Sequence, residues 1–155
     1  IGSSMKSVGE IMAIGKSFEE IIQKGLRMIG QGMHGFVGNT DLTFDNLDDE
    51  LANPTDMRIF AVAEAFDRGY SIDRLHELTK ISPWFLEKLQ NIHNFKLKLE
   101  SYDHIEDIPQ EVLSEAKRLG FSSKSPASSK IPPVTSKQKA YVCVTFARKW
   151  AYFLR

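Results

Sequence analysis

Cysteine is nearly absent from this 155-residue sequence: Cys143 is the only one, so no disulfide can form within the chain. A single cysteine also suits a reducing compartment. No run of about 18 apolar residues occurs, which excludes a membrane-spanning helix of the usual length. Residues 1–16 lack the basic, apolar and small-residue order of a secretory signal peptide. The 42% hydrophobic and 26% charged fractions are instead typical of a globular domain with a packed core.

The motifs that define several enzyme classes are missing as well. No two histidines lie at a metal-ligand spacing, and the sequence has neither a P-loop lysine motif nor a G-x-S-x-G motif. His93 falls within an expected helix face, which favours a structural role. Cys143 has no basic partner that the sequence can assign. These patterns therefore give no catalytic, cofactor-binding or metal-binding residue.

Acidic residues are absent from residues 122–155, which hold seven Lys and Arg, whereas residues 1–121 hold 13 Lys and Arg against 20 Asp and Glu. This asymmetry is typical of a nucleic-acid-binding tail, or of a segment that does not belong to the same fold. Six serines and three prolines in residues 122–137 predict disorder there. The apolar stretch with Val142 and Val144 is compatible with a strand or an amphipathic helix.

Start and stop signals predict an all-α unit of about five helices in residues 17–120. Ser17 and Glu20 have the spacing of a capping box, and Ser82-Pro83 places a proline at a first helical position. Apolar residues at helical spacing follow each expected start. The expected starts are Ser17, Thr55, Ser71, Ser82 and Pro109, and the glycines expected to end helices are Gly30, Gly69 and Gly120.

Three further segments carry predictions. Residues 30–53, which are rich in glycine and then acidic, are expected to form a loop. Trp84 and Phe85 favour a core anchor, with an interface contact as the alternative. Residues 11–14 read as a strand beside Glu10, whose carboxylate is costly to bury unless it lines a polar passage or faces water.

Two long stretches resemble the large chain of carbamoyl-phosphate synthetase. Residues 2–28 read GSSMKSVGEIMAIGKSFEEIIQKGLRM and residues 50–89 read ELANPTDMRIFAVAEAFDRGYSIDRLHELTKISPWFLEKL, followed later by AKRLGFS. The resemblance implies that residues 1–16 are the C-terminal edge of a carboxyphosphate-forming ATP-grasp α+β domain. It implies that residues 17–121 are an incomplete helical oligomerisation domain. Residues 122–155 depart from the family, and we expect a divergent basic tail, disordered or the product of an aberrant gene model.

The resemblance also implies a function. The parent enzyme uses ATP, with Mg or Mn, to make carbamoyl phosphate from bicarbonate and glutamine-derived ammonia. Met5 and Glu10 would line its carbamate passage, and this fragment would join the two synthetase halves and support oligomerisation without being catalytic alone.

The same resemblance implies the partners and the location. The partners would be the other large-chain domains, a glutamine amidotransferase and further copies of the chain, with no cofactor bound to this fragment and no membrane contact. The location would be cytoplasmic, or mitochondrial for an arginine or urea pathway. The alternative is a non-enzymatic helical interaction module with a basic nucleic-acid-binding tail.

Overall fold

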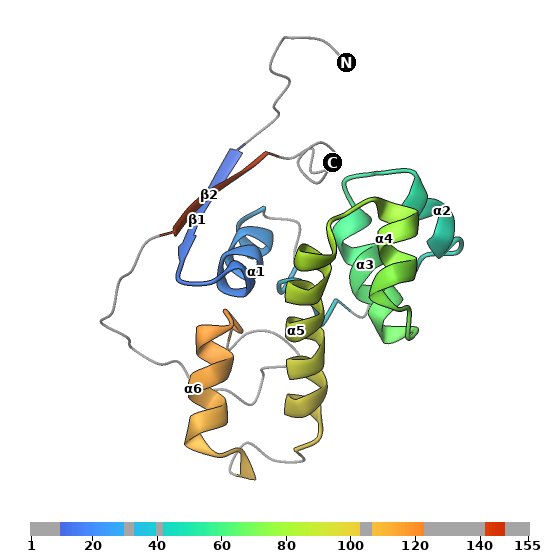
Figure 1. Ribbon diagram of the computed structural model, residues 1–155. Coiled ribbons are helices and arrows are strands. Elements are labelled where there is room, and N and C mark those ends of the chain that lie inside the picture. Colours follow the sequence, from blue (N-terminus) through green and yellow to red (C-terminus); the bar gives the residue numbers. More distant parts are fainter. Residues whose placement is uncertain (1–9, 30–32, 40–41, 103–106, 123–141, 148–155) are drawn as a thin grey trace.

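The computed structural model describes residues 10–29, 33–39, 42–102, 107–122 and 142–147. These residues form β1 (Glu10–Gly15), α1 (Phe18–Met28), α2 (Leu47–Ala52), α3 (Arg58–Asp67), α4 (Ile72–Thr79), α5 (Pro83–Glu100), α6 (Gln110–Arg118) and β2 (Val142–Ala147). The prediction of a mainly helical domain with a strand near its start is therefore confirmed. Figure 1 shows the strand pair next to α1, and α5 running between α1 and the group formed by α2, α3 and α4.

Serine side chains cap two helices at the predicted positions. The Ser17 hydroxyl accepts a hydrogen bond from the backbone N–H of Glu20 at 3.2 Å, and the Ser71 hydroxyl accepts one from the N–H of Arg74 at 3.2 Å. Each bond satisfies one of the free N–H groups of a first helical turn. The starts of α1 and α4 are therefore fixed locally by the sequence.

Two other predicted starts are only partly correct. Pro83 is the first residue of α5, as predicted, but the Ser82 hydroxyl makes no capping hydrogen bond. Thr55 does not cap α3, because its hydroxyl accepts from the N–H of Met57 in the turn before the helix, which begins at Arg58. A threonine that binds the backbone two residues ahead stabilises a turn instead of a helix start.

Helix α2 lies inside residues 30–53, where we expected only a loop, so that prediction is wrong for residues 47–52. The Asn46 side chain caps the helix by accepting from the N–H of Asp49 at 3.3 Å. Leu47 and Leu51 are buried, and Leu51 is fully inaccessible to solvent. Two leucines in six residues are too few for a recognisable period, and contacts with α3 and α4 supply the stabilisation. The described residues therefore contain six helices and not five.

The core is formed by the apolar faces that helical spacing predicted, and α5 contacts α1, α3 and α4. Two glycines end helices as predicted: Gly69 follows α3 with φ +79°, and Gly120 follows α6 with φ +85°. Rings also connect the helices, because Phe95 on α5 and Phe121 after α6 have centroids 5.7 Å apart. The largest fully buried side chains are Phe36, Ile21, Ile22, Leu51, Leu75, Leu86, Leu89, Ile92, Gln23 and Val62.

The two strands are antiparallel, and their register runs from Glu10 opposite Ala147 to Gly15 opposite Val142. Along β1, Ala13 is buried whereas Met12 and Ile14 are exposed, as the two faces of a strand require. For residues 142–147 the strand alternative is confirmed and the helix is wrong, because their backbone pairs with β1. The expectation of a disordered or aberrant tail over residues 122–155 stays a prediction, because residues 123–141 and 148–155 lie outside the described residues.

No helix in the described part of the chain is long and apolar enough to cross a lipid bilayer.

Candidate functional site

The passage-lining role that the resemblance implied for Met5 and Glu10 stays a prediction. Met5 lies outside the described residues. Glu10 is the first residue of β1, where its backbone pairs with Ala147, and the position of its side chain is not described. The basic side chains of the tail also lie outside the described residues, so the nucleic-acid alternative stays a prediction.

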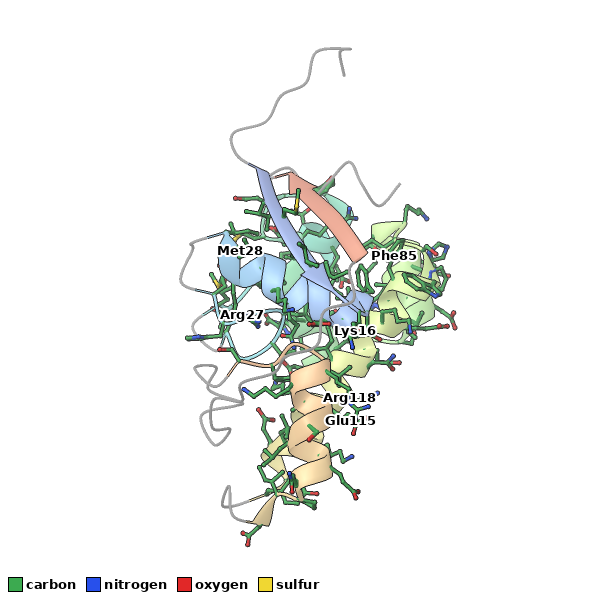
Figure 2. The ribbon with its side chains drawn as sticks, turned by 90° about the vertical axis from the view of Figure 1, so that its left-hand side faces the viewer. Lys16, Arg27, Met28, Phe85, Glu115 and Arg118 are labelled. Carbon is green, nitrogen blue, oxygen red and sulfur yellow. The ribbon has the colours of Figure 1, made fainter. Side chains whose placement is uncertain are left out.

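The strand meets the helical body at a junction built around Glu20. Its Oε2 accepts a hydrogen bond from the backbone N–H of Lys16 at 2.7 Å, and its Oε1 binds Lys24 Nζ at 2.5 Å. Lys24 Nζ also donates to the carbonyl oxygen of Ile14 at 2.9 Å. One carboxylate therefore holds both the linker before α1 and a lysine that reaches back to β1. Lys16 lies at the end of β1 in Figure 2.

The predicted capping box is half confirmed. Ser17 binds the N–H of Glu20, as predicted, but the Glu20 carboxylate binds the N–H of Lys16 and not that of Ser17. The carboxylate also lies against Gly15, where a Cβ atom would be only 2.8 Å from Glu20 Oε2. The strand can therefore approach the helix this closely because residue 15 has no side chain.

Gln23 ties α1 to the end of α6 and to the loop near residue 35. It is a buried polar residue, and its Nε2 donates to the carbonyl oxygen of Leu119 at 3.2 Å. A Cβ atom on Gly35, where φ is +135°, would lie 2.5 Å from Gln23 Oε1. Because 96 residues separate Gln23 from Leu119, no local pattern could have revealed this contact.

An aromatic group lies where α1 and α5 begin. The ring centroids of Phe18 and Phe85 are 5.3 Å apart, and Trp84 stacks edge-on against both rings at 5.7 and 4.9 Å. Lys88 Nζ lies 5.6 Å from the Trp84 ring and 3.5 Å from Glu19 Oε1. Trp84 is 51% exposed, so the core-anchor interpretation is wrong for it, although Phe85 is half-buried. An exposed tryptophan supported by other rings is typical of an interface.

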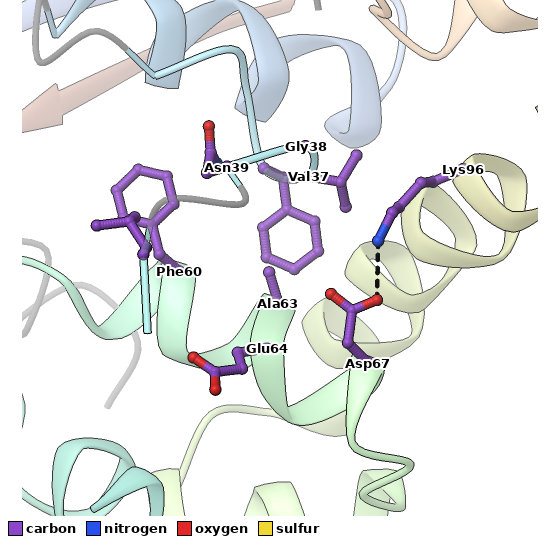
Figure 3. A pocket seen from close by; sticks show the side chains of 10 residues that line it. Val37, Gly38, Asn39, Phe60, Ala63, Glu64, Asp67 and Lys96 are labelled. Atoms are coloured by element: carbon purple, nitrogen blue, oxygen red, sulfur yellow. Dashed lines mark hydrogen bonds and ion pairs between the residues drawn. The ribbon is translucent and has the colours of Figure 1, made fainter. Parts of the chain in front are cut away.

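A pocket of about 250 Å³ opens between α3, α5 and the loop that precedes α2. Figure 3 shows Asp67 and Lys96 joined across one side of it. Its wall is mixed, with apolar side chains next to carboxylates, an amide and an ammonium group. The lining residues are Phe36, Val37, Gly38, Asn39, Leu42, Phe60, Ala63, Glu64, Asp67 and Lys96.

Asp67 and Lys96 are the two polar lining residues that bind each other, whereas Asn39 and Glu64 bind residues outside the lining. Asp67 Oδ1 accepts from Lys96 Nζ at 2.8 Å and contacts the Nε2 atom of the buried His93 at 3.0 Å. Partial burial would raise the pKa of Asp67, but the hydrogen bonds from Lys96 and His93 outweigh it and lower that pKa. His93 therefore has the structural role that the sequence favoured.

The described residues were also compared with the requirements of a metal site. In the part of the chain that the structure describes, no group of three or more His, Cys, Asp or Glu side chains could hold a metal ion. Sequence reasoning missed the pocket because its residues come from three segments between residues 36 and 96 that only the fold brings together.

The sequence of this chain matches a known protein family. The sequence model of a family described as "Carbamoyl-phosphate synthetase large chain, oligomerisation domain" matches residues 10–131. The match starts at the first residue of β1 and extends past the last residue of α6, so it includes the junction, the aromatic group and the pocket.

Several relatives are identical to the chain at about half of 125 aligned positions. "Multifunctional protein CAD" of Squalus acanthias is 53% identical, over 80% of this chain and 5% of that protein. "Multifunctional protein URA2" of Saccharomyces cerevisiae is 50% identical, over 80% and 6%. "Carbamoyl phosphate synthase arginine-specific large chain, mitochondrial" of Neurospora crassa is 49% identical, over 80% and 10%. The chain therefore spans a tenth or less of the length of these three relatives.

Proposed function

Because the chain belongs to the family of the oligomerisation domain of the carbamoyl-phosphate synthetase large chain, we propose that it joins the two synthetase halves of such a large chain and supports self-association. The complete protein would then synthesise carbamoyl phosphate from bicarbonate and glutamine-derived ammonia, with ATP. Its partners are the other large-chain domains and a glutamine amidotransferase, and it acts in the cytoplasm or the mitochondrion.

The observation that carries the joining role is the junction around Glu20. A domain that connects two catalytic units must fix the direction in which the chain enters it. Here the carboxylate of Glu20 and the ammonium of Lys24 bind the backbone of residues 14 and 16, so the direction of β1 is fixed relative to α1. The carboxylate of Glu20 also lies directly against Gly15 of the strand.

Catalytic groups for ATP chemistry belong, in this proposal, to parts of the protein other than these 155 residues. The described residues provide no metal-holding cluster, and we assign ATP with its Mg or Mn to the ATP-grasp halves. We therefore expect the 155-residue chain by itself to show no bicarbonate-dependent ATP hydrolysis. Measurable hydrolysis by the purified chain, abolished by omission of bicarbonate, would contradict this assignment.

Self-association is assigned to the exposed aromatic group formed by Phe18, Trp84 and Phe85. Sedimentation velocity of the chain over a concentration series tests it. We expect a concentration-dependent oligomer that Trp84→Ser weakens at least about tenfold, since truncation of an interface tryptophan costs about 2 kcal/mol or more. Leu97→Ser is the matched control, because Leu97 is 48% exposed on the same helix but lies outside this group. A monomer at every concentration, or equal effects of both variants, would overturn this assignment.

The passage-lining role of Met5 and Glu10 is part of the same proposal. In a complete large chain, Glu10→Ala should leave bicarbonate-dependent ATP hydrolysis intact and reduce the yield of carbamoyl phosphate per ATP consumed. Glu111→Ala, at an exposed position in the first turn of α6, is the control. An unchanged ratio of product to ATP in the Glu10 variant would remove that residue from the passage.

A further inference from the structure

Arg27 and Lys117 are among the described cationic side chains for which the structure provides no counter-charge within the described residues. Arg27 lies in the last turn of α1 and Lys117 in the last turn of α6. Neither forms an ion pair with another described residue. Arg27 Nη1 is buried and has no hydrogen-bond acceptor. A buried guanidinium N–H without an acceptor is costly, so its presence calls for an explanation.

The fold holds these two helix ends close together. Gln23, one turn before Arg27, binds the carbonyl oxygen of Leu119, two residues after Lys117. The backbone of Gly35 lies against both Gln23 and Arg27, since a Cβ atom there would be 3.5 Å from Arg27 Nη1. Burial and the positive charge of Arg27 both lower the pKa of Lys117, and burial lowers the pKa of Arg27. The two cations therefore repel one another in a partly buried setting.

The helix dipoles explain only part of this arrangement. A cation in the last turn of a helix is stabilised by the nearby carbonyl groups, which accounts for one basic residue in each of α1 and α6. It does not account for two cations that repel one another, nor for the buried N–H of Arg27. An oxyanion would resolve both, because a guanidinium binds two oxygens in one plane and an ammonium adds a point charge.

We propose that Arg27 and Lys117 form a binding site for an oxyanion, a carboxylate or a phosphate group, where the ends of α1 and α6 meet the loop at Gly35. The site is independent of the proposed function. Figure 2 shows Arg27 beside Met28, well separated from Arg118 on α6. Arg118 is an exposed cation in the same turn as Lys117 and likewise forms no ion pair with a described residue, so it provides the matched control.

Thermal unfolding of the chain in phosphate or acetate, against chloride at equal ionic strength, tests the proposal. We expect about 10 mM of one oxyanion to raise the Tm by about 3 °C, as for a site with a millimolar Kd. Arg27→Met and Lys117→Met should abolish this rise, whereas Arg118→Met should keep it. Comparison between variants removes the general stabilisation that phosphate gives to any protein. A response to phosphate alone or to acetate alone identifies the group that the site prefers.

A second measurement covers the case in which Arg27→Met does not fold. Phosphate or acetate titrated into the unmodified chain should shift the backbone amide resonance of Gly35, with saturation at millimolar concentration. Lys117→Met should weaken that titration at least about tenfold, as for loss of one desolvated charge pair. No rise in Tm and no saturable shift with either anion, or equal loss in the Arg118 variant, would overturn the proposal.

Discussion

Gly120 lies directly against Glu20: a Cβ atom on Gly120 would be 3.0 Å from both the Cα and the carbonyl oxygen of Glu20. At Gly120 the end of α6 therefore touches the backbone of the first turn of α1. The same residue, Glu20, uses its side chain to hold the linker to β1. Glu20 therefore contacts both the linker to β1 and the end of α6. Glu20 and Gly120 meet although 100 residues separate them in the sequence.

Gly120→Ala should destabilise the domain by about 2 to 3 kcal/mol. Its φ of +85° strains any residue with a side chain, and the added Cβ would also collide with the backbone of Glu20. Gly69→Ala is a matched control, because Gly69 has a similar φ of +79° but nothing within 4 Å of its Cβ position. It should cost only about 1 kcal/mol. Urea denaturation measures both, and equal losses would show that the contact at Glu20 contributes nothing.

The helices that the sequence predicted best are those whose signals are local. Ser17 and Ser71 cap the residues three positions ahead, and Pro83 begins α5, so a few consecutive residues determine each start. α2 was missed because its stabilisation depends on the burial of Leu47 and Leu51 and on contacts with α3 and α4, which no local pattern announces. The sequence could not decide between strand and helix for residues 142–147 either. These residues form a strand because they pair with β1, which lies more than 120 residues earlier.

The candidate site was less predictable than the fold. Hydrophobicity placed Trp84 in the core, yet the structure leaves it 51% exposed, in edge-on contact with Phe85 and Phe18. The junction around Glu20 was partly visible as a capping box, but the role of Lys24 was not. Arg27 and Lys117 carry no sequence signal at all, since their proximity depends on how α1 and α6 pack.

Glu20→Ala should destabilise the domain by about 1 to 2 kcal/mol, because it removes an acceptor from the N–H of Lys16 and an ion pair with Lys24. Glu20→Gln keeps an oxygen acceptor and should lose only about 0.5 kcal/mol. Hydrogen exchange at the Lys16 amide should accelerate in the alanine variant only. Glu115→Ala, which removes an exposed carboxylate 3.8 Å from Lys98, serves as control. Unchanged exchange at Lys16 would contradict the proposed hydrogen bond.

Asp67 should make a contribution to stability that disappears in acid. Its pKa is lowered in the folded state, so its stabilising contribution is present above the unfolded carboxyl pKa of about 3.9 and is lost as the pH falls through the folded value. Asp67→Asn should therefore lower the free energy of unfolding by about 0.5 to 1 kcal/mol at neutral pH, and by progressively less as the pH falls below about 3.9. Asp56→Asn, at an exposed carboxylate without an ion pair to a described residue, should show no such trend. A constant difference between wild type and Asp67→Asn from pH 7 to pH 2.5 would refute this role.

Arg58→Met should be the most destabilising substitution of a charged residue in this domain, at about 2 to 3 kcal/mol. Arg58 Nη2 donates to the carbonyl oxygens of Leu51 at the end of α2 and of Thr79 at the end of α4, the latter at 2.8 Å. Methionine fills a similar volume but leaves both helix-end carbonyls without this donor. Arg74→Met is the control: Arg74 pairs with Asp48 in the open, so its loss should cost about 1 kcal/mol or less. Urea denaturation of both variants decides the matter, and a loss at Arg58 no larger than that at Arg74 would mean that α2 and α4 are held by apolar packing alone.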